Sequence, residues 1–307
     1  MDLSVIIVSY NTRELLRGCL TSVISTLISS QLNYEVCVVD NASTDGSATM
    51  VQDDFSQARL LTNRENRGFA AANNQAIAVS RGRNVLLLNP DTVVKEEALR
   101  KMANFLDEHS QVGAVGPKLI YPDGSFQHSA FTFPTLPMIF LDFFPINHRL
   151  NNSRLNGRYP RALYQAIQPF PIDHPLGAGL MVRREAIEEV GLLDEGFFMY
   201  CEEIDWCMRI KRAGWKIYCL PGAEIVHYVG QSTAQLRDQM FVELHRSRYR
   251  LYEKHYPSRF RLMARWLVLL GLTYRSLQAR WASRCGRLDK DAMQRRLGAY
   301  RQVRSLS

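Results

Sequence analysis

The sequence predicts an α/β fold with a doubly wound, mostly parallel mixed sheet and a basic helical extension at its C-terminal end. Three observations favour this class. Strand and helix patterns alternate through residues 3–108, the strands end abruptly in polar side chains, and residues 237–307 have a basic helical pattern. Strands that alternate with helices pack as a parallel sheet with helices on both of its faces.

The first two strands are separated by an amphipathic helix. Leu3–Val8 is an apolar run, which is typical of a strand buried on both faces. Thr12 is expected to cap the helix that follows, whose apolar residues recur with helical spacing as far as Leu27. Val36–Val39 is the second strand, and the turn-forming residues 41–47 lead into a short helix.

The alternation continues through two more strands. Arg59–Thr62 is the third strand and Asn84–Leu88 the fourth, with helices expected at Phe69–Ser80 and Lys95–Glu108. The rhythm breaks after Pro117. Residues 121–175, rich in proline, asparagine and aromatics, are expected to form an excursion that covers a cleft. Regular patterns then resume as a strand at 179–182, a helix from 184, a helix at 202–213, and strands at 216–220 and 224–227.

Composition excludes several classes of protein. Hydrophobic residues make up 46% and charged residues 22%, as in an ordinary globular protein. The six cysteines form no CxxC pair and no zinc-type spacing, so reduced thiols in a cytoplasmic protein are expected. The N-terminal residues carry no basic leader, so a signal peptide is not expected. No segment approaches the roughly 20 apolar residues of a membrane span, so a transmembrane helix is not expected either.

The net charge of +8 is distributed unevenly. Residues 245–307 hold 16 Lys and Arg against three acids, which leaves residues 1–244 with a net charge of −5. This asymmetry favours an anionic partner for the extension. Arginines around Leu262 and Trp266 suit a helix that lies in a membrane interface, although the same apolar face could pack on the body of the protein. Nucleic acid is disfavoured because no binding module accompanies the charge.

Polar side chains follow three strands of the predicted sheet. The apolar run Val85–Leu88 ends in Asn89-Pro90-Asp91, and a carboxylate is not expected unpaired inside a buried strand. Asp91 is therefore expected just past the carboxyl end of the strand, where open α/β sheets bind ligands, although the tripeptide alone could be a simple turn. The first two strands end likewise, in Ser9, Asn11 and Asp40. Together these residues predict a pocket for a polar ligand, in which Asp40 either contacts a nucleoside or caps a helix.

A diphosphate bound in this pocket would need a metal ion. The first strand is not followed by a GxGxxG loop, and the sequence contains no GxxxxGK[ST] motif. These absences argue against a dinucleotide-dependent oxidoreductase and against a P-loop enzyme. Asp91 could hold a divalent cation on the phosphates, with His227 at the end of a later strand as a candidate second ligand. A lone histidine at a strand end is more often structural.

Three acids open the helix after an aromatic run at residues 197–200. They are Glu202, Glu203 and Asp205. Acids in a first helical turn complement the helix dipole. One that is desolvated beside the aromatics could instead act as a general base toward an alcohol. Glu203 is the preferred candidate, with Glu202 and Asp205 as helpers or competitors.

The ordered motifs of the chain resemble those of the family 2 glycosyltransferases with the GT-A fold, in particular the rhamnosyltransferase-like branch. The resemblance covers roughly residues 3–235. The motifs that carry it lie at residues 4–11, 38–47, 66–74, 88–91, 116–118, 123–125, 177–179, 198–205 and 227–232.

The resemblance implies roles for several of these motifs. Asp40 would contact the base or ribose of the donor, and Gly68 and Asn73 would belong to the same nucleotide-sugar site. Asn89 and Asp91 stand where the family has its DxD element. Asp91 would then bind Mg²⁺ or Mn²⁺, with His227 as its partner, and the acidic motif would supply the base.

Two residues depart from the family pattern. Asn89 stands where an aspartate is common, which lowers the negative charge at the metal. Glu203 stands where the family usually has the aspartate of a Glu-Asp pair, so the choice between Glu202 and Glu203 stays open. The expected domains are a catalytic body at 1–236, with a nucleotide-binding half at 1–115 and an acceptor half at 116–236, and the extension at 237–307.

The functional hypothesis is an inverting glycosyltransferase. It would move a sugar, with rhamnose as the candidate, from a dTDP- or UDP-sugar to a hydroxyl of a lipid-linked or cell-surface polysaccharide precursor. Its expected location is the cytoplasm, peripherally at the inner face of the membrane. The alternative is a catalytically idle GT-A-like module that binds membrane or nucleic acid through its extension. A sugar nucleotidyltransferase is disfavoured because the N-terminal region lacks a glycine-rich, basic triphosphate loop.

Overall fold

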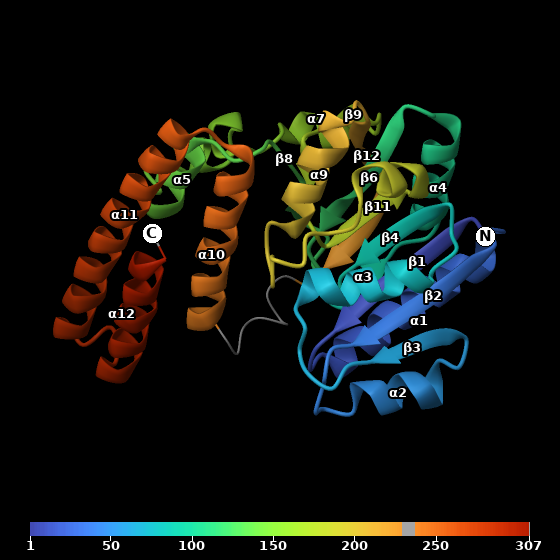
Figure 1. Ribbon diagram of the computed structural model, residues 1–307, viewed down its shortest axis with the longest axis horizontal. Helices are drawn as coiled ribbons and strands as arrows, with labels where there is room; N and C mark the ends of the chain where they lie inside the picture. The colour runs from blue at the N-terminus through green and yellow to red at the C-terminus, as the bar shows by residue number, and fades with distance from the viewer. Residues whose placement is uncertain (229–236, 307) are drawn as a thin grey trace. The chain divides into compact units, whose positions relative to one another are not determined.

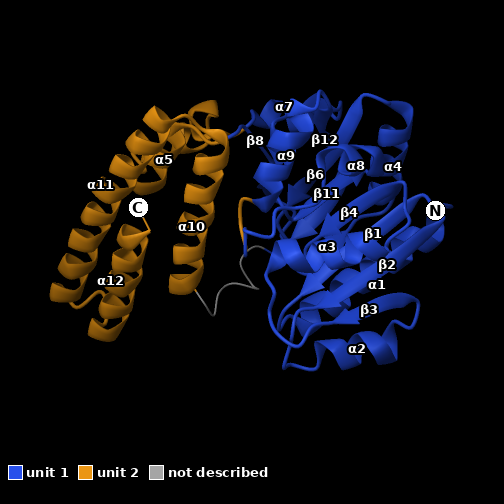
Figure 2. Ribbon diagram, in the orientation of Figure 1, with its two compact units in different colours: residues 1–133, 159–198, 202–232 blue, residues 134–158, 199–201, 233–307 orange. Residues whose placement is uncertain are grey.

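A computed structural model describes residues 1–228 and 237–306 (Figure 1). These residues form two compact units (Figure 2). The first, here called the sheet unit, comprises the described residues of 1–133, 159–198 and 202–232. The second, the helical unit, comprises the described residues of 134–158, 199–201 and 233–307.

The sheet unit is built on a mixed sheet of the predicted doubly wound type, with the strand order β3-β2-β1-β4-β11-β6-β12-β5. Its parallel half consists of β1 (Leu3–Ser9), β2 (Tyr34–Asp40), β3 (Ala58–Thr62) and β4 (Asn84–Leu88). The other half consists of β5 (Thr92–Val94), β6 (Val112–Ile120), β11 (Gly179–Arg183) and β12 (Lys216–His227). There β11 runs antiparallel to both β4 and β6, and β12 runs parallel to β6 but antiparallel to β5.

Four short strands complete the sheet unit. β7 (Phe126–Gln127) pairs with β6, and β9 (Phe170–Pro171) pairs with β12. β8 (Ala130–Phe131) and β10 (His174–Pro175) form a separate two-stranded sheet.

Helices cover both faces of the large sheet because side chains alternate along each buried strand. On β1, Val5 and Ile7 join one apolar cluster, while Ile6 and Val8 join the other. The first cluster packs under α1 (Arg13–Ser29), α2 (Ser47–Asp54) and α4 (Ala98–Glu108). The second packs under α3 (Phe69–Val79), α8 (Arg184–Val190) and α9 (Glu202–Arg212), and α7 (Arg161–Gln165) adds Tyr164 to it.

The helical unit has its own packed interior. It contains α5 (Leu136–Phe143), α6 (His148–Asn151), the 3₁₀ turn η1 (Arg154–Asn156), α10 (Arg237–His255), α11 (Ser258–Arg284) and α12 (Lys290–Ser305). Gly271 lets α11 approach α5 closely, because a Cβ at that position would lie 2.1 Å from Cγ of Phe143. Arg248 of α10 donates to Asp142 of α5 at 2.7 Å. No helix among the described residues is long and apolar enough to cross a bilayer.

Several expectations need correction. β6 was not expected as a strand, and the two strands predicted at 216–220 and 224–227 are one strand, β12, with a register shift between Leu220 and Glu224. The helix expected from Lys95 begins at Ala98, after the short strand β5. Thr12 makes no side-chain capping bond, because its hydroxyl lies 2.9 Å from the Ser9 hydroxyl instead. Residues 134–158 and 199–201 group with the C-terminal helices, whereas the sequence suggested a division at residue 236.

Candidate active site

The carboxyl ends of β1, β2 and β4 meet at one edge of the sheet. Ser9 pairs in register with Asp40, and Ile7 pairs with Leu88. The backbone N–H of Asn41 donates to the Ser9 carbonyl at 2.8 Å, which extends the pairing one residue beyond the strands. The polar residues that end these strands are therefore neighbours, as expected for a doubly wound sheet.

Asp40 and Asn11 hold the turn at residues 41–47 and leave one carboxylate oxygen of Asp40 open. Asp40 Oδ2 accepts a hydrogen bond from the Ser43 N–H at 3.0 Å, and Asn11 Oδ1 accepts one from the Thr44 N–H at 2.7 Å. Asp40 Oδ1 is buried and has no hydrogen-bond partner among the described residues. Since a buried acceptor without a partner is costly, this oxygen is a candidate contact for a donor group of a ligand.

Asn41 and Gly68 connect this edge to the loop that precedes the acidic helix. Asn41 Nδ2 donates to the Gly68 carbonyl at 3.3 Å. Gly68 has a φ of +83°, and a Cβ there would lie 2.5 Å from the Phe198 carbonyl oxygen, so only glycine fits. The Phe69 N–H donates to that same oxygen at 2.7 Å. Two motifs that are distant in the sequence thus meet beside the end of β2.

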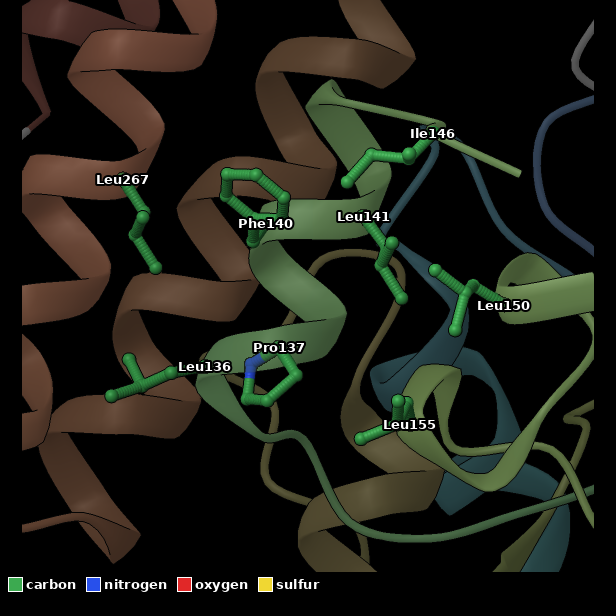
Figure 3. A pocket seen from close by; sticks show the side chains of 8 residues that line it. All are labelled: Leu136, Pro137, Phe140, Leu141, Ile146, Leu150, Leu155 and Leu267. Carbon is green, nitrogen blue, oxygen red and sulfur yellow. The ribbon is translucent and has the colours of Figure 1, made fainter.

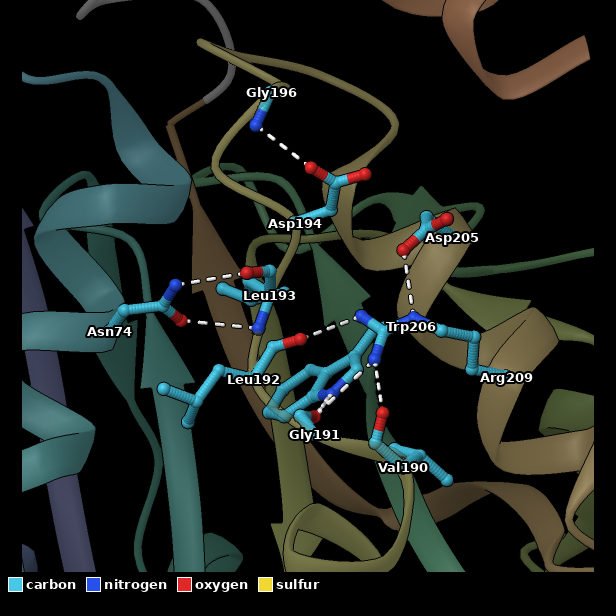
Figure 4. Close-up of polar contacts among 10 residues, drawn as sticks. All are labelled: Asn74, Val190, Gly191, Leu192, Leu193, Asp194, Gly196, Asp205, Trp206 and Arg209. Atoms are coloured by element: carbon cyan, nitrogen blue, oxygen red, sulfur yellow. Dashed lines mark hydrogen bonds and ion pairs between the residues drawn. The ribbon is translucent and has the colours of Figure 1, made fainter. Parts of the chain in front are cut away.

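The asparagine pair of α3 supports this arrangement. Asn73 is buried, and its Nδ2 donates to the Phe69 carbonyl at 2.8 Å, so it stabilises the first turn of α3. Asn74 exchanges two hydrogen bonds with the backbone of Leu193, donating to its carbonyl at 2.9 Å and accepting from its N–H at 3.1 Å (Figure 4). The amide of Asn73 is therefore engaged within its own helix, whereas Asn74 ties α3 to the backbone of Leu193.

Asp91 and His227 form the pair that the sequence nominated for a metal. The antiparallel pairing of β12 with β5 sets His227 opposite Thr92, next to Asp91. His227 Nε2 lies 3.5 Å from Asp91 Oδ1, and both side chains are buried. The Asn89 N–H donates to the Ala178 carbonyl at 3.1 Å, which fixes the turn that carries Asp91 against the start of β11.

These two residues fit a divalent cation whose coordination is completed by a ligand. Asp91 Oδ1 makes no hydrogen bond among the described residues and faces the imidazole. A carboxylate oxygen with an imidazole nitrogen is a suitable donor pair for Mn²⁺. Within residues 1–228 and 237–306, no group of three or more His, Cys, Asp and Glu side chains is arranged to hold a metal ion. Phosphate oxygens and water would therefore have to supply the other ligands.

Gln127 sets the orientation of His227. Its side-chain amide nitrogen lies 3.1 Å from His227 Nδ1, while its buried Oε1 has no hydrogen-bond partner within residues 1–228 and 237–306. Turning the amide by half a rotation would bring Oε1 to Nδ1, so that Nδ1 carries the proton and the lone pair of Nε2 points toward Asp91. A hydrogen-bond partner on the second ring nitrogen is typical of histidines that ligate metals.

The two glutamates at the start of α9 differ in their surroundings. Glu202 is buried, and burial, with the neighbouring Glu203 as the second cause, raises its pKa well above the usual range of a carboxyl group. Glu203 is only half-buried. A Cβ at Gly177 would lie 3.5 Å from Glu203 Cδ, so the Glu203 carboxylate lies against the backbone at Gly177. The next residue, Ala178, accepts the hydrogen bond from the Asn89 N–H. Glu203 is thus the acid that lies toward the Asn89–Asp91 turn.

Asp205 has a structural partner. It is fully buried, and its Oδ2 lies 2.9 Å from Nε of Arg209 one turn later. The same guanidinium group donates to the carbonyls of Val190 and Leu192 at 2.6 and 2.8 Å (Figure 4). Asp205 therefore stabilises α9 against the loop at residues 190–193.

The backbone just before the two glutamates is unusual. Tyr200 and Cys201 have φ values of 70° and 66°, which lie in the left-handed region that residues other than glycine rarely adopt. The preceding carbonyl, of Met199, accepts a hydrogen bond from the Ser247 hydroxyl of α10 at 2.7 Å. Two consecutive left-handed residues persist only where surrounding contacts hold them, and such strain is concentrated at functional sites.

The sequence reasoning missed two contributors to this site. Asn41 was expected only as part of the turn at residues 41–47, and Gln127 lies within the excursion at residues 121–175, for which no site residue was expected. Only the β7–β6–β12 neighbourhood brings Gln127 to His227. The motif that starts at His227 continues into residues 229–232, which lie outside the described residues.

Comparison with known proteins identifies the family. The model of the family described as glycosyl transferase family 2 matches residues 4–191. The chain belongs to this family. Membership makes the protein a glycosyltransferase, which favours an enzyme over the idle module and confirms the family expected from the motifs.

Two similar proteins are rhamnosyltransferases by name. The N-acetylglucosaminyl-diphospho-decaprenol L-rhamnosyltransferase of Mycobacterium tuberculosis is 28% identical over 290 residues, which cover 89% of this chain and 91% of that protein. The dTDP-rhamnosyl transferase RfbF of Shigella flexneri is 26% identical over 208 residues, or 66% and 63% of the two chains. The rhamnosyltransferase-like resemblance is thereby confirmed.

Solved glycosyltransferase structures confirm the GT-A fold. The mannosyltransferase PcManGT from Pyrobaculum calidifontis, in complex with GDP-Man and Mn²⁺, aligns with a TM-score of 0.59 and 17% identity, over 99% of this chain and 85% of that one. GalNAc-T7 with UDP, GalNAc and Mn²⁺ aligns with a TM-score of 0.55 and 15% identity, over 80% and 47%. At these identities the likeness concerns the fold.

Proposed function

We propose that this glycosyltransferase moves a sugar from a nucleoside diphosphate to a hydroxyl group by single displacement with inversion. Rhamnose is the candidate sugar and a lipid-linked or polysaccharide precursor the candidate acceptor, as the names of the relatives suggest. The single observation that carries the proposal is the gathering of three groups in the sheet unit. They are the open oxygen of Asp40, the Asp91–His227 pair, and Glu203 over the Gly177 backbone.

Asp40 is proposed to recognise the nucleoside of a dTDP- or UDP-sugar. Its open Oδ1 is an acceptor for an N–H of the base or a hydroxyl of the ribose, while its Oδ2 stays bonded to the Ser43 N–H. Asn11 accepts a hydrogen bond from the same turn, and the absence of a side chain at Gly68 lets the backbone at Phe198 approach closely. Ligand binding at this edge agrees with the general behaviour of open α/β sheets.

Asp91 and His227 are proposed to hold Mg²⁺ or Mn²⁺ at the donor diphosphate. A bound divalent cation supplies Lewis-acid stabilisation of the charge that develops on the leaving nucleoside diphosphate. Asp91 provides the anionic ligand, and Gln127 fixes the ring of His227. Because Asn89 contributes no charge at this turn, we propose that the cation binds tightly only together with the donor phosphates.

Glu203 is proposed as the general base. Burial raises the pKa of Glu202, whereas Glu203 is only half-buried and lies beside the Gly177 backbone, so we assign the role of base to Glu203. Glu203 can then accept the proton of the acceptor hydroxyl as that oxygen attacks the anomeric carbon, and the bond to the diphosphate breaks on the opposite face. Asp205 is proposed as a positioning residue, through Arg209.

The test is to measure donor binding by differential scanning fluorimetry, with UDP-, dTDP- and GDP-sugars in the presence and absence of Mn²⁺. We expect one class of donor to raise the melting temperature, and to do so more strongly with Mn²⁺. Asp91→Asn should remove the Mn²⁺-dependent part, whereas the control Asp53→Asn, at an exposed position of α2, should retain it. Equal Mn²⁺ responses of wild type and Asp91→Asn would remove Asp91 from the metal site.

A further inference from the structure

Helix α11 carries an apolar stripe on the face opposite to its buried one. Its buried residues, Ala264, Val268, Gly271, Leu272 and Ala279, face the interior of the helical unit. Seven of the 17 large hydrophobic side chains that are exposed among the described residues lie on this one helix. Five of them, spaced by four or seven residues, form the stripe: Leu262, Trp266, Leu270, Leu277 and Trp281. Trp266 is 66% and Trp281 59% exposed.

Positive charge borders the stripe along the helix. α11 contains six arginines and no acidic residue. Arg259, Arg261 and Arg265 are exposed near its first turns, and Arg280 and Arg284 near its last. Two copies of this chain could not bring their stripes together without opposing these arginines across the contact. Nucleic acid would leave the apolar stripe between the arginines without a partner.

The same unit contains a pocket with an entirely apolar lining (Figure 3). Its volume is about 430 Å³, and Leu267 of α11 lines it together with side chains of α5, α6, η1 and the loop between α5 and α6. Two of these, Ile146 and Leu155, are themselves largely exposed. Residues 143–158, which supply the second side of the pocket, hold three arginines and no acid.

We infer that the helical unit docks on the surface of an anionic phospholipid bilayer, with α11 lying in the plane of the interface. Trp266 and Trp281 enter the headgroup region, the arginines bind lipid phosphates, and the pocket accepts an acyl chain. Amphipathic helices that bind in this way combine an apolar, tryptophan-bearing face with basic flanks and no transmembrane length. The inference rests on the helical unit alone and is independent of the donor, metal and base assigned to the sheet unit.

Vesicle flotation with the full-length protein tests this inference. We expect binding to vesicles of phosphatidylcholine with phosphatidylglycerol, weak binding to phosphatidylcholine alone, and release by high salt. Trp266→Ser combined with Trp281→Ser should weaken partitioning at least about tenfold. Arg265→Gln combined with Arg280→Gln should weaken it by about fivefold for each charge removed. Ile28→Ser, a matched control at a 72% exposed position of α1, should bind as wild type does.

Three results would overturn the inference. They are equal binding to neutral and anionic vesicles, wild-type binding by the double tryptophan variant, and a wild-type dimer in solution that the same variant dissociates. Circular dichroism checks that the variants fold, and transfer to a water-soluble acceptor should stay at the wild-type rate in all of them. A protein that binds vesicles but transfers no sugar would refute only the proposed function.

Discussion

Replacing Asp205 with asparagine separates a structural acid from a catalytic one. Its carboxylate is fully buried and lies 2.9 Å from Arg209, whose side chain is 22% exposed. Removing one partner of a buried ion pair costs about 3–5 kcal/mol. Because Arg209 keeps its bonds to the Val190 and Leu192 carbonyls and part of its hydration, we expect the lower end, about 3 kcal/mol.

The assay is equilibrium urea unfolding at pH 7, followed by tryptophan fluorescence. Trp206 is a suitable reporter because its indole N–H donates to the Gly191 carbonyl within the same loop contact. We expect a lower unfolding midpoint with an unchanged slope, and a transfer rate per folded molecule within about threefold of wild type. Glu14→Gln, which removes a solvent-exposed carboxylate of α1, should change stability by less than about 0.5 kcal/mol. If Asp205→Asn were as stable as wild type but more than about a hundredfold slower, Asp205 would be the base and our assignment would be refuted.

Four further outcomes are expected. Glu202→Gln should be more stable than wild type at pH 8 but not at pH 4. The pKa of Glu202 is higher in the folded state than in the unfolded state, so the wild type loses stability as the pH rises, whereas glutamine does not titrate. Plots of melting temperature against pH that run parallel for the two proteins would contradict this. Gly68→Ala should lower the free energy of unfolding by about 1–3 kcal/mol and remove most donor binding, because the new Cβ would lie 2.5 Å from the Phe198 carbonyl oxygen. Scanning calorimetry measures the loss of stability, and titration calorimetry measures the loss of donor binding. Ser247→Ala should lower kcat several-fold at an unchanged donor KM by releasing Met199, while Ser276→Ala, which removes a comparable hydroxyl–carbonyl bond within α11, should leave kcat unchanged. Gln127→Leu should raise the Mn²⁺ concentration needed for half-maximal transfer about ten- to a hundredfold, and an unchanged requirement would argue against its role at His227.

The parallel half of the fold was predictable from local pattern. The bounds of β4 at Asn84 and Leu88 follow from a continuous apolar run between two polar residues. In β6, by contrast, Gly116 and Pro117 interrupt the pattern. The glycine has a tertiary cause, because a Cβ at Gly116 would lie 2.3 Å from Cβ of Pro175 in β10. Local propensity carries no information about such a contact.

The site was predictable to the same extent. Asp40 and Asp91 stand directly after buried strands, so their meeting at one edge follows from topology alone. His227 reaches Asp91 only through the antiparallel pairing of β12 with β5, and β5 had no recognisable pattern of its own. Among the acids the sequence left three candidates, which their burial and partners now distinguish: Asp205 is paired, Glu202 is buried, and Glu203 is half-buried.

The most direct test of the central claim, that this edge of the sheet is a glycosyl-transfer site with Glu203 as its base, is the steady-state rate of sugar transfer by Glu203→Gln. We expect kcat to fall by about 10²–10⁴-fold, with the KM for the donor and the melting temperature unchanged. The matched variant Glu202→Gln should retain a kcat closer to that of wild type. A Glu203→Gln enzyme that transfers sugar at the wild-type rate would contradict the account.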